Sequence, residues 1–553
     1  MKAAEPSGAC RGKNDPAGPK DYSGCTLEDL IGAYDDPGDR GDNDSKDDFD
    51  PELSATALIP GERLTFESDE LEIRGATSRL SKQKSFKVEF NDASGDAAGD
   101  WYGMERFQLN KHPYDLSRIR NKLSFDLFKE IDDFPSLRSQ FVHVFVTDEN
   151  APERGEQDFG LFTNIEYMDE VWAKNHGQDE NANVFKAEQF EFLSPSQTPA
   201  VTADPDSDEF ETVLESKGDN EDTTVLLEML TALGDEQVDF TQTFNRYFHP
   251  DNFRTWLAIN ILMSNSDSNS QNFYLYRPAA IDTFYFTPWD YDGAWDFYGQ
   301  PAEASNMRPR WEQGVANWWN MTLVRRYIQS GAGNVPALTA KIDELYAGPL
   351  KPAKVRSVID SYPDQVDEIE SKEPDVGGLP TGPSSSESTP AQRATEIERL
   401  PGTITAARDL YKKTLKRPMP MYLEILIEDG NVELRWDRSY DIQGDALFYD
   451  VRLATAPALT DTLAACRTDD DPMPVLDSAN VVFQVDETPG TSATPTPALT
   501  PGTDYFLQVV ARDAEGYCQS ALDVYYDDDS DTEYPGILGF RYKADGSIEP
   551  IAD

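Results

Sequence analysis

Hydrophobic and polar side chains alternate along much of the first third of the chain. From Glu62 to Phe90 the alternation gives three short runs, LTFES, LEIRG and SFKVEF, and it returns in FVHVFVTD (141–148) and DFGLFTNIEYM (158–168). A period of two residues is typical of strands with one face against a core. We therefore expect an N-terminal sheet in which 141–148 and 158–168 form a strand pair.

Between these strand regions the apolar spacing changes to that of a helix. Five apolar residues recur on one helical face: Leu116, Ile119, Leu123, Leu127 and Ile131. Asp115 or Ser117 is placed to cap the first turn of this helix. The stretch from Ala200 to Asn220 is acidic, and we expect a loop or an insertion there.

A second block begins at Asp251. FRTWLAINILM (253–263) predicts a largely buried helix, and NFYLYR (272–277) and TFYFTPWD (283–290) predict two strands after a polar loop. Helical patterns resume from about 317 to 417, interrupted by the linker-like GGLPTGPSSSESTP. Strands, then helix and strands, then helices favour an α+β domain with two lobes.

The last part of the chain changes to short alternating strands, at the spacing of an all-β immunoglobulin- or fibronectin-like sandwich. The runs are VELRWD, FYDVRLA, VVFQVD, YFLQVVARD and LDVYY. LTPGTDYFLQVVARD resembles the fibronectin type III signature, which implies that Tyr505 forms the corner and Trp436 lies in the core. We expect an acidic Gly-, Pro- and Asp-rich segment (1–55), the α+β domain (56–417) and the sandwich (418–553).

The cysteines fall as one pair near the N-terminus, Cys10 and Cys25, and one near the C-terminus, Cys466 and Cys518. Such local pairs predict two disulfides and an oxidising compartment, so we expect a secreted or cell-surface protein. The start, MKAAEPSGAC, has no hydrophobic signal core, which favours a mature chain. No apolar run approaches the roughly 18 residues of a membrane span.

The charge balance is strongly acidic, with 102 Asp and Glu against 49 Lys and Arg and a formal net charge of −53. Such a surface repels nucleic acids and anionic membranes, so neither is an expected partner. High salt, calcium and plain solubility all remain open as the reason for the acidity. Calcium on the acidic segments is kept as an alternative, although DDPGDRGDNDSKDDFD (35–50) lacks the Gly and Glu positions of a calcium loop.

Candidate chemistry lies in the polar loop NSDSNSQN (265–272). Asp267 and Asn272 have the D-x-x-x-x-N spacing of a protein-kinase catalytic loop, and Asp290 follows at the end of the next strand pair. Phosphoryl transfer needs a carboxylate near the attacking hydroxyl and oxygen ligands that hold magnesium against the phosphates. Each residue taken singly is an ordinary turn residue, but their order and spacing together favour the kinase interpretation.

Six motifs in order strengthen this interpretation: RGATSRLSKQKSFKVEF, LNKHPYDLSRIRNKLSFDLFKEI, GLFTNIEYMDEVW, NVFKAEQF, NSDSNSQNFYLY and TPWDYDGAWDF. Together they resemble the CotH kinase family, atypical secreted kinases first associated with spore coats and similar in core architecture to protein kinases. The resemblance covers about residues 60 to 330 and extends plausibly to 417. It implies that the α+β domain is a two-lobed, protein-kinase-like core.

The resemblance also implies roles for individual residues. Asp267 is expected to orient and deprotonate the acceptor hydroxyl, Asn272 and Asp290 to bind magnesium, and Asp292 to assist a second ion. Arg74 belongs to an Arg-Gly pair expected to overlie the phosphates, although the following Ala-Thr-Ser departs from the family pattern.

Lys84 and Lys87 both match basic family positions; one is expected to neutralise the α- and β-phosphates, and we favour Lys84. Glu166 and Lys186 are expected to shape the nucleotide pocket. For Glu166 the alternative is a buried ion pair with Arg120.

The leading hypothesis is an ATP-dependent kinase with magnesium, or manganese in its place, that phosphorylates Ser or Thr of extracellular or surface proteins. The alternative is a non-catalytic pseudokinase that acts as a structural or adhesion protein of a surface or spore matrix. A sugar or small-molecule acceptor is a third hypothesis, because a kinase-like core does not fix the acceptor. Hydrolase motifs such as G-x-S-x-G and H-E-x-x-H do not occur.

Overall fold

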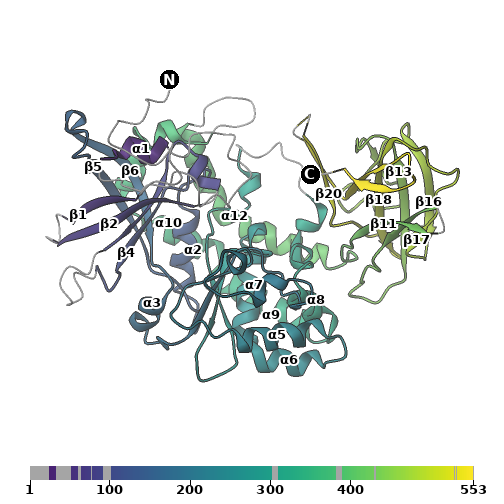
Figure 1. Cartoon of the computed structure of the whole chain (residues 1–553), viewed down its shortest axis with the longest axis horizontal. Helices are drawn as coiled ribbons and strands as arrows, with labels where there is room; N and C mark the ends of the chain where they lie inside the picture. The colour runs from purple at the N-terminus through teal and green to yellow at the C-terminus, as the bar shows by residue number, and fades with distance from the viewer. Residues whose placement is uncertain are drawn as a thin grey trace. The chain divides into compact units, whose positions relative to one another are not determined.

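The computed structural model describes residues 24–32, 52–59, 64–75, 77–90, 101–301, 309–380, 389–428, 431–528, 530 and 532–551. Most of the expected segment 1–55 lies outside these residues, with its Asp-rich stretch and Cys10, and so does most of the expected linker. The chain divides into two compact units, each described by itself below (Figure 1). Among the described residues, every helix is too short or too polar to cross a membrane.

Unit 1 comprises Met1–Phe190, Ser194–Ala304 and Ala340–Ile404. Its first sheet has six antiparallel strands in the order β1-β2-β3-β4-β6-β5. The strands are β1 (Leu53–Ile59), β2 (Leu64–Arg74), β3 (Ser85–Glu89), β4 (Arg106–Asn110), β5 (Ser139–Thr147) and β6 (Glu156–Ile165). The expected pairing of 141–148 with 158–168 is confirmed as the β5–β6 hairpin.

The first expected strands differ in detail from the structure. LTFES and LEIRG are not two strands but one continuous strand, β2, and β1 is an additional partner. The buried residues change from even positions (Phe66) to odd positions (Ile73) along β2. A bulge in the β1–β2 register absorbs this change of parity, because one extra residue reverses the alternation of faces.

The expected helix after β4 is α2 (Arg120–Phe128), which packs against β5 and α10 (Pro352–Ile359). It begins later than the apolar spacing indicated, so Leu116 precedes the helix. Asp115 nevertheless stabilises the first turn of α2, because the Asp115 Oδ2 accepts a hydrogen bond from the Arg120 backbone N at 3.1 Å.

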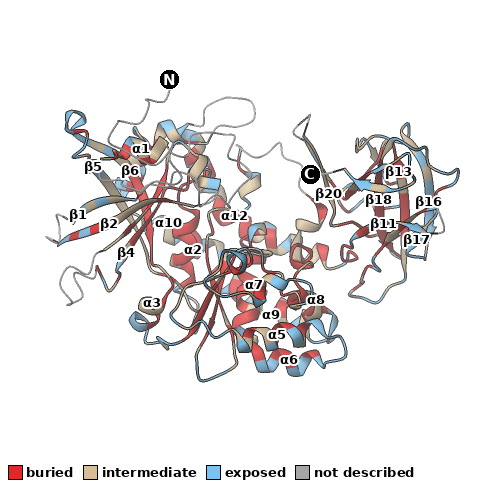
Figure 2. Ribbon diagram, viewed as in Figure 1, coloured by how far each residue is buried: buried red, intermediate tan, exposed pale blue. Residues whose placement is uncertain are grey.

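The second sheet of unit 1 has the order β10-β9-β7-β8. Its strands are β7 (Asn183–Ala187), β8 (Leu214–Ser216), β9 (Phe273–Arg277) and β10 (Tyr285–Pro288). Helix α7 (Pro250–Leu262) is largely buried (Figure 2). It packs on β10, with the Trp256 ring stacked on Phe286 at a centroid distance of 4.4 Å.

The acidic stretch 200–220 is not simply a loop, which corrects the sequence expectation. It contains the short helix α4 (Asp208–Glu211) and the edge strand β8. Phe210 and Leu214 are both fully buried, so two well-placed apolar residues anchor an otherwise polar segment.

The remaining helices are α1 (Leu27–Gly32), α3 (Glu170–Asn175), α5 (Thr224–Gly234), α6 (Phe240–Tyr247), α8 (Thr322–Gln329), α9 (Asn334–Ala347), α11 (Asp364–Glu370) and α12 (Pro390–Thr414). Of these, α8, α9, α11 and α12 lie in the expected helical region from about 317 to 417, whereas α1, α3, α5 and α6 were not expected. Helices and antiparallel sheets together give the expected mixed α+β class.

Unit 2 comprises Glu191–Leu193, Ser305–Thr339 and Thr405–Asp553. One sheet contains β11 (Leu423–Glu428), β12 (Asn431–Trp436) and β17 (Ser492–Ala493). The larger sheet contains β16 (Val481–Thr488), β13 (Leu447–Ala454), β18 (Thr503–Asp513), β22 (Ile537–Tyr542) and β23 (Ile548–Pro550), with β19 (Cys518–Ser520) on β18. Two further pairs are β14 (Asp461–Thr462) with β15 (Pro474–Val475) and β20 (Val524–Asp527) with β21 (Thr532–Pro535).

The two larger sheets of unit 2 contribute to one apolar cluster, to which Trp436 belongs. The Tyr505 hydroxyl accepts a hydrogen bond from the Thr500 backbone N at 2.9 Å, as expected for a tyrosine corner. The expected disulfide between Cys466 and Cys518 is confirmed. The boundaries near residues 55 and 417 stay predictions.

Candidate functional site

The β9–β10 hairpin brings two predicted ligands to the same end of a sheet. Pro288 pairs with Phe273, and the Trp289 N donates to the Asn272 carbonyl oxygen at 3.3 Å. Asn272 precedes the first strand and Asp290 follows the second, so the hairpin register places the two residues side by side across its open end.

Asp267 joins them from the turn of 3₁₀-helix at Ser266–Ser268. Its exposed carboxylate accepts hydrogen bonds from Asn272 Nδ2 and Gln271 Nε2, both at 2.7 Å. A Cβ added at Gly293 would lie 3.7 Å from the Asp267 Cβ, so the loop after Asp290 passes close to Asp267. The predicted catalytic residue and the predicted metal ligands are therefore neighbours.

A buried polar network fixes this arrangement. The Asn265 backbone N donates to the Asn260 carbonyl oxygen at 2.9 Å, and its side chain donates to Asn260 Oδ1 at 3.2 Å. The Tyr291 hydroxyl donates to the same Oδ1 at 2.7 Å. Side chains thus connect helix α7, the polar loop and the segment after β10. Asn265 stands where a protein-kinase catalytic loop carries the His of His-Arg.

Asp292 lies close to Asp290 and to His112, which the sequence pattern did not indicate as a site residue. One ligand atom each of His112, Asp290 and Asp292 lies within 4.8 Å of the others. His112 Nδ1 lies 3.2 Å from Asp292 Oδ2, and Asn121 Nδ2 donates to Asp290 Oδ1 at 3.3 Å. His112 and Asn121 both belong to the motif LNKHPYDLSRIRNKLSFDLFKEI, which was the available signal for them.

The electrostatics of the two carboxylates differ. The pKa of Asp290 is raised to about 7, first by burial and then by the neighbouring Asp292 carboxylate. Burial is the largest single influence on Asp292 and acts to raise its pKa, but the hydrogen bond and the charge of His112, with hydrogen bonds from Asp290 and Gly293, together hold that pKa below its ordinary value. Two carboxylates that repel each other, with the Asn272 amide oxygen nearby, suit a hard divalent cation such as Mg²⁺.

Arg74 is the predicted phosphate-binding residue most closely coupled to this cluster. It ends β2, and its guanidinium carbon lies 5.7 Å from the centroid of the Trp289 ring. Burial lowers the pKa of Arg74, while the Asp290 carboxylate is the largest influence in the opposite direction. Lys186 lies in the same electrostatic environment, paired with Glu188 and Glu215.

The two candidate lysines have different surroundings. Lys84 is 3% exposed, and its Nζ donates to the Arg79 carbonyl oxygen at 2.5 Å. Lys87 pairs with Glu70, Glu72 and Glu89. In the β2–β3 register Lys87 lies opposite Glu72 and Ser85 lies opposite Arg74, so Lys87 is on the sheet face that carries Arg74. Which of the two lysines contacts a phosphate stays a prediction.

Glu166 lies in the segment that links β6 to α3. Its buried carboxylate binds the Arg138 backbone N at 3.0 Å and Arg138 Nε at 2.8 Å, and His176 Nε2 at 2.9 Å. The alternative pairing with Arg120 is wrong. Arg120 instead pairs with Asp115 and Glu396.

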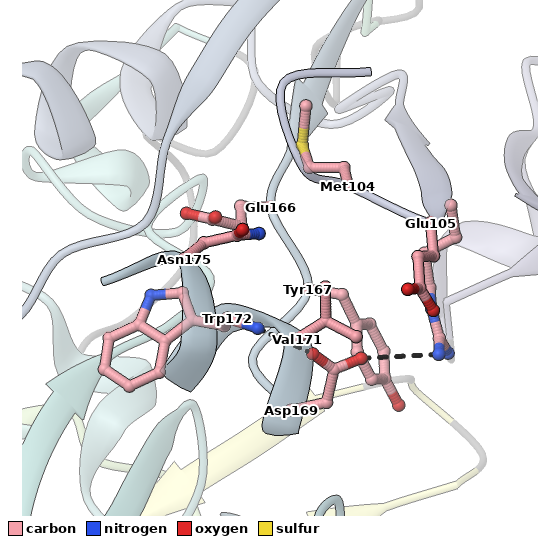
Figure 3. Close-up of a pocket in the computed structure, with 9 residues that line it drawn as sticks. Met104, Glu105, Glu166, Tyr167, Asp169, Val171, Trp172 and Asn175 are labelled. Atoms are coloured by element: carbon pink, nitrogen blue, oxygen red, sulfur yellow. Dashed lines mark hydrogen bonds and ion pairs between the residues drawn. The ribbon is translucent and has the colours of Figure 1, made fainter. Parts of the chain in front are cut away.

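A small pocket opens beside this linking segment, lined by residues 104–106 and by six residues between 166 and 175 (Figure 3). Asp169 accepts from the Trp172 backbone N and forms an ion pair of 3.3 Å with Arg106. The Arg106 guanidinium lies over the Tyr167 ring, 4.2 Å from its centroid. In this pocket the Arg106 guanidinium therefore covers the aromatic face of Tyr167 and neutralises the buried Asp169.

Comparisons with known proteins agree with the residues gathered here. A family model described as CotH kinase protein matches residues 71–401, a span that contains Arg74, the polar loop and Asp292. Inner spore coat protein H of Bacillus subtilis (strain 168) is 26% identical over 268 residues, which is 47% of this chain and 67% of the relative.

Proposed function

Because the chain belongs to the CotH kinase protein family, we propose that it transfers the γ-phosphate of ATP to Ser or Thr hydroxyls of extracellular or surface proteins. The observation that carries the proposal is the meeting of Asp267, Asn272 and Asp290 at the open end of the β9–β10 hairpin. These are the oxygen-bearing groups that phosphoryl transfer requires, in the order along the chain that kinases use.

In this proposal the fold is a two-lobed kinase-like core. The six-stranded sheet forms one lobe, and the four-stranded sheet with its helices forms the other. The segment after β6 links them. Glu166 would hold the linking segment in place through Arg138 rather than contact the nucleotide itself.

Each residue of the site would have a separate task. Asp267 is the exposed carboxylate, and it would orient the acceptor hydroxyl and accept its proton as the oxygen attacks the γ-phosphorus. Asn272, Asp290 and Asp292 would hold Mg²⁺, or Mn²⁺ in its place, and His112 would fix the orientation of Asp292. The cation would neutralise charge on the β- and γ-phosphates.

The phosphates also need positive groups from the protein. Arg74 is suited to this because it lies at the end of β2 beside Trp289 and interacts with Asp290. Lys87 lies on the same sheet face and would contribute once a phosphate competes with its glutamate partners. Lys84 would instead support the turn after Arg74 through the Arg79 carbonyl.

The strand-rich part of unit 2 would be a fibronectin type III-like sandwich that acts as a spacer or adhesion module. Its support is the Tyr505 corner, the buried Trp436 and one apolar cluster with contributions from two sheets. The name of the relative is that of an inner spore coat protein, which favours a location on a spore or cell surface. The Cys466–Cys518 disulfide is consistent with such an oxidising location.

The test is transfer of labelled phosphate from ATP with Mg²⁺ or Mn²⁺, to the chain itself and to a panel of secreted proteins. Asp267→Asn and Asp290→Asn should each lower the rate by at least about 10³-fold, the scale expected for a lost general base or metal ligand. Asp282→Asn is the matched control, because Asp282 is exposed and pairs with Arg246. A parental rate in either site variant would refute the assignment.

The pseudokinase alternative gives a different result in the same preparation. A non-catalytic scaffold would transfer no phosphate from the parent chain and would show the same melting temperature with and without millimolar Mg²⁺–ATP. A kinase at a hundredfold excess of ligand over Kd gains about 2.7 kcal/mol, which is easily seen as a shift in melting.

A further inference from the structure

Three aspartates of unit 2 meet outside the proposed kinase site. Asp441 and Asp445 lie in the loop between β12 and β13, and Asp513 is the last residue of β18. Asp513 pairs in register with Leu447, the first residue of β13, so the loop necessarily ends beside it. One carboxylate oxygen from each aspartate lies within 4.8 Å of those of the other two.

Hydrogen bonds fix two of these carboxylates from one side. Asp441 Oδ1 accepts from the Asp445 backbone N at 2.9 Å. Asp513 Oδ1 accepts from the backbone N of Glu515 at 2.8 Å and of Tyr517 at 2.9 Å. The turns on either side of the cluster are therefore held in place by one oxygen of each of these two carboxylates.

The second carboxylate oxygen of Asp441 is unusual because it has no partner. Asp441 is only 6% exposed, and its Oδ2 is buried without any hydrogen-bond partner. A buried carboxylate oxygen without a partner is costly, and native proteins rarely leave one without an ion or water. Because this oxygen belongs to a group of three carboxylates, a cation is the partner that would satisfy it.

The cluster also lacks a compensating charge. In the part of the chain that the structure describes, none of the three carboxylates forms an ion pair with a lysine or arginine. Asp513 is only 1% exposed. Burial raises the pKa of Asp513, and the Asp441 carboxylate raises it further. Three crowded acidic groups, two of them buried, are stable together only if protons or a cation neutralise them.

We propose that Asp441, Asp445 and Asp513 bind a Ca²⁺ ion that fastens the β12–β13 loop to the end of β18. An all-carboxylate set excludes soft metals, which prefer sulfur or imidazole. Mg²⁺ is disfavoured because it keeps several waters, and two of the three residues here are buried. Ca²⁺ accepts irregular sets of carboxylate and carbonyl oxygens and gives up its waters more readily.

The ion would connect two segments that are distant in sequence. The turn after Asp513 leads directly to Cys518 and its disulfide with Cys466. Calcium would therefore stabilise the same end of unit 2 that the disulfide stabilises. This proposal is independent of the kinase assignment, since no residue is shared between the two sites.

Calcium binding to the full chain, freed of metal by a chelator, tests the proposal by isothermal titration without nucleotide. An Asp290→Asn, Asp292→Asn background removes both carboxylates of the His112 cluster from the measurement. We expect one Ca²⁺ per chain, with Mg²⁺ at least about tenfold weaker, and an increase in the melting temperature on adding Ca²⁺. Absence of Ca²⁺ binding in this background would overturn the proposal.

Asp441→Asn and Asp445→Asn should each weaken Ca²⁺ binding at least about tenfold, because each removes one charge from the ligand set. Asp445 is half-buried, so its variant serves where the buried Asp441 variant fails to fold. Asp504→Asn is the matched control, at the opposite end of β18 and about 30 Å away at 3.3 Å per residue. Binding unchanged in both cluster variants would show that Ca²⁺ binds elsewhere.

Discussion

At the scale of residues, three members of the candidate site have left-handed backbone conformations. The φ angles are 61° at Asn272, 51° at Asp290 and 49° at His112. Asn, Asp and His tolerate this region better than other residues with a Cβ, and such conformations cluster at functional sites. The backbone conformation therefore restricts each of these positions in addition to the role proposed for its side chain.

A second residue-scale feature lies away from the site, at the C-terminal end of α11. Glu370 is 2% exposed, and its Oε2 has no hydrogen-bond partner. Burial first, and then the Asp375 carboxylate, raise the pKa of Glu370 to about 7, although the Arg118 guanidinium opposes the shift. Folding therefore favours the protonated form of this carboxyl.

This raised pKa predicts how Glu370→Gln changes the pH dependence of stability. The contribution of protonated Glu370 to the free energy of unfolding is fully present below its ordinary pKa near 4.5, and it is lost as the pH rises through about 7. Between pH 4.5 and 8 the variant should gain stability over the parent by up to about 3 kcal/mol, at about 1.4 kcal/mol per pKa unit. Urea unfolding at both pH values measures the gain.

Glu368→Gln is the control for this experiment, because Glu368 is exposed on the same helix and pairs with Lys372. The control should show no gain at high pH. Parallel pH profiles for the parent and Glu370→Gln would contradict the raised pKa.

At the scale of elements, two that form the candidate site followed the sequence pattern closely. The β9–β10 hairpin and α7 were both expected from their apolar runs. Strand β8 was missed because it is short and lies in an acidic stretch, where Phe210 and Leu214 carry the burial. Two buried apolar residues are enough to anchor so short a segment, but a periodic pattern can be recognised only in a longer run of apolar residues.

The corner of β18 gives a prediction at this scale. Tyr505 is 4% exposed, and its hydroxyl accepts from the Thr500 backbone N. Tyr505→Phe should destabilise unit 2 by about 1–2 kcal/mol, because the Thr500 N–H loses its partner while the ring stays in place. Tyr542→Phe, at the half-buried end of β22, is the control. Equal unfolding midpoints for the two variants would contradict a role for the corner.

At the scale of the whole molecule, residues 305–339 group with the C-terminal strands rather than with the preceding domain. A buried charge network within unit 2 explains the grouping. Arg310 Nη2 lies 2.5 Å from Asp470 Oδ2, and Arg417 Nη2 lies 2.6 Å from Asp470 Oδ1. Arg310 also donates to the Cys518 carbonyl oxygen at 2.9 Å.

Asp470→Asn should therefore unfold unit 2 more easily. Removal of the shared carboxylate leaves two buried guanidinium groups short of a counter-charge, a loss of about 3–5 kcal/mol for buried pairs. Asp469→Asn is the neighbouring control, since Asp469 is exposed and pairs with Arg467. Thermal unfolding followed separately for the two units should show the loss in unit 2 alone. A shift of equal size in the control would argue against the network.

The sequence by itself determined the mixed α+β class of the chain, the strands with the clearest alternation, helices α2 and α7, and the order of the residues expected to carry chemistry. These follow from local periodicity and from spacings such as that between Asp267 and Asn272, which a single loop preserves. It also gave the Cys466–Cys518 pairing, because few partners were available.

Tertiary structure decided which of these residues meet. His112 and Asp292 are far apart in sequence but 3.2 Å apart in space, and Asp441 and Asp513 are brought together by strand register. No local pattern encodes such contacts, because burial and electrostatic coupling depend on how whole elements pack. The pairing of β2 with β3, for the same reason, decided that Lys87 and Arg74 share a sheet face.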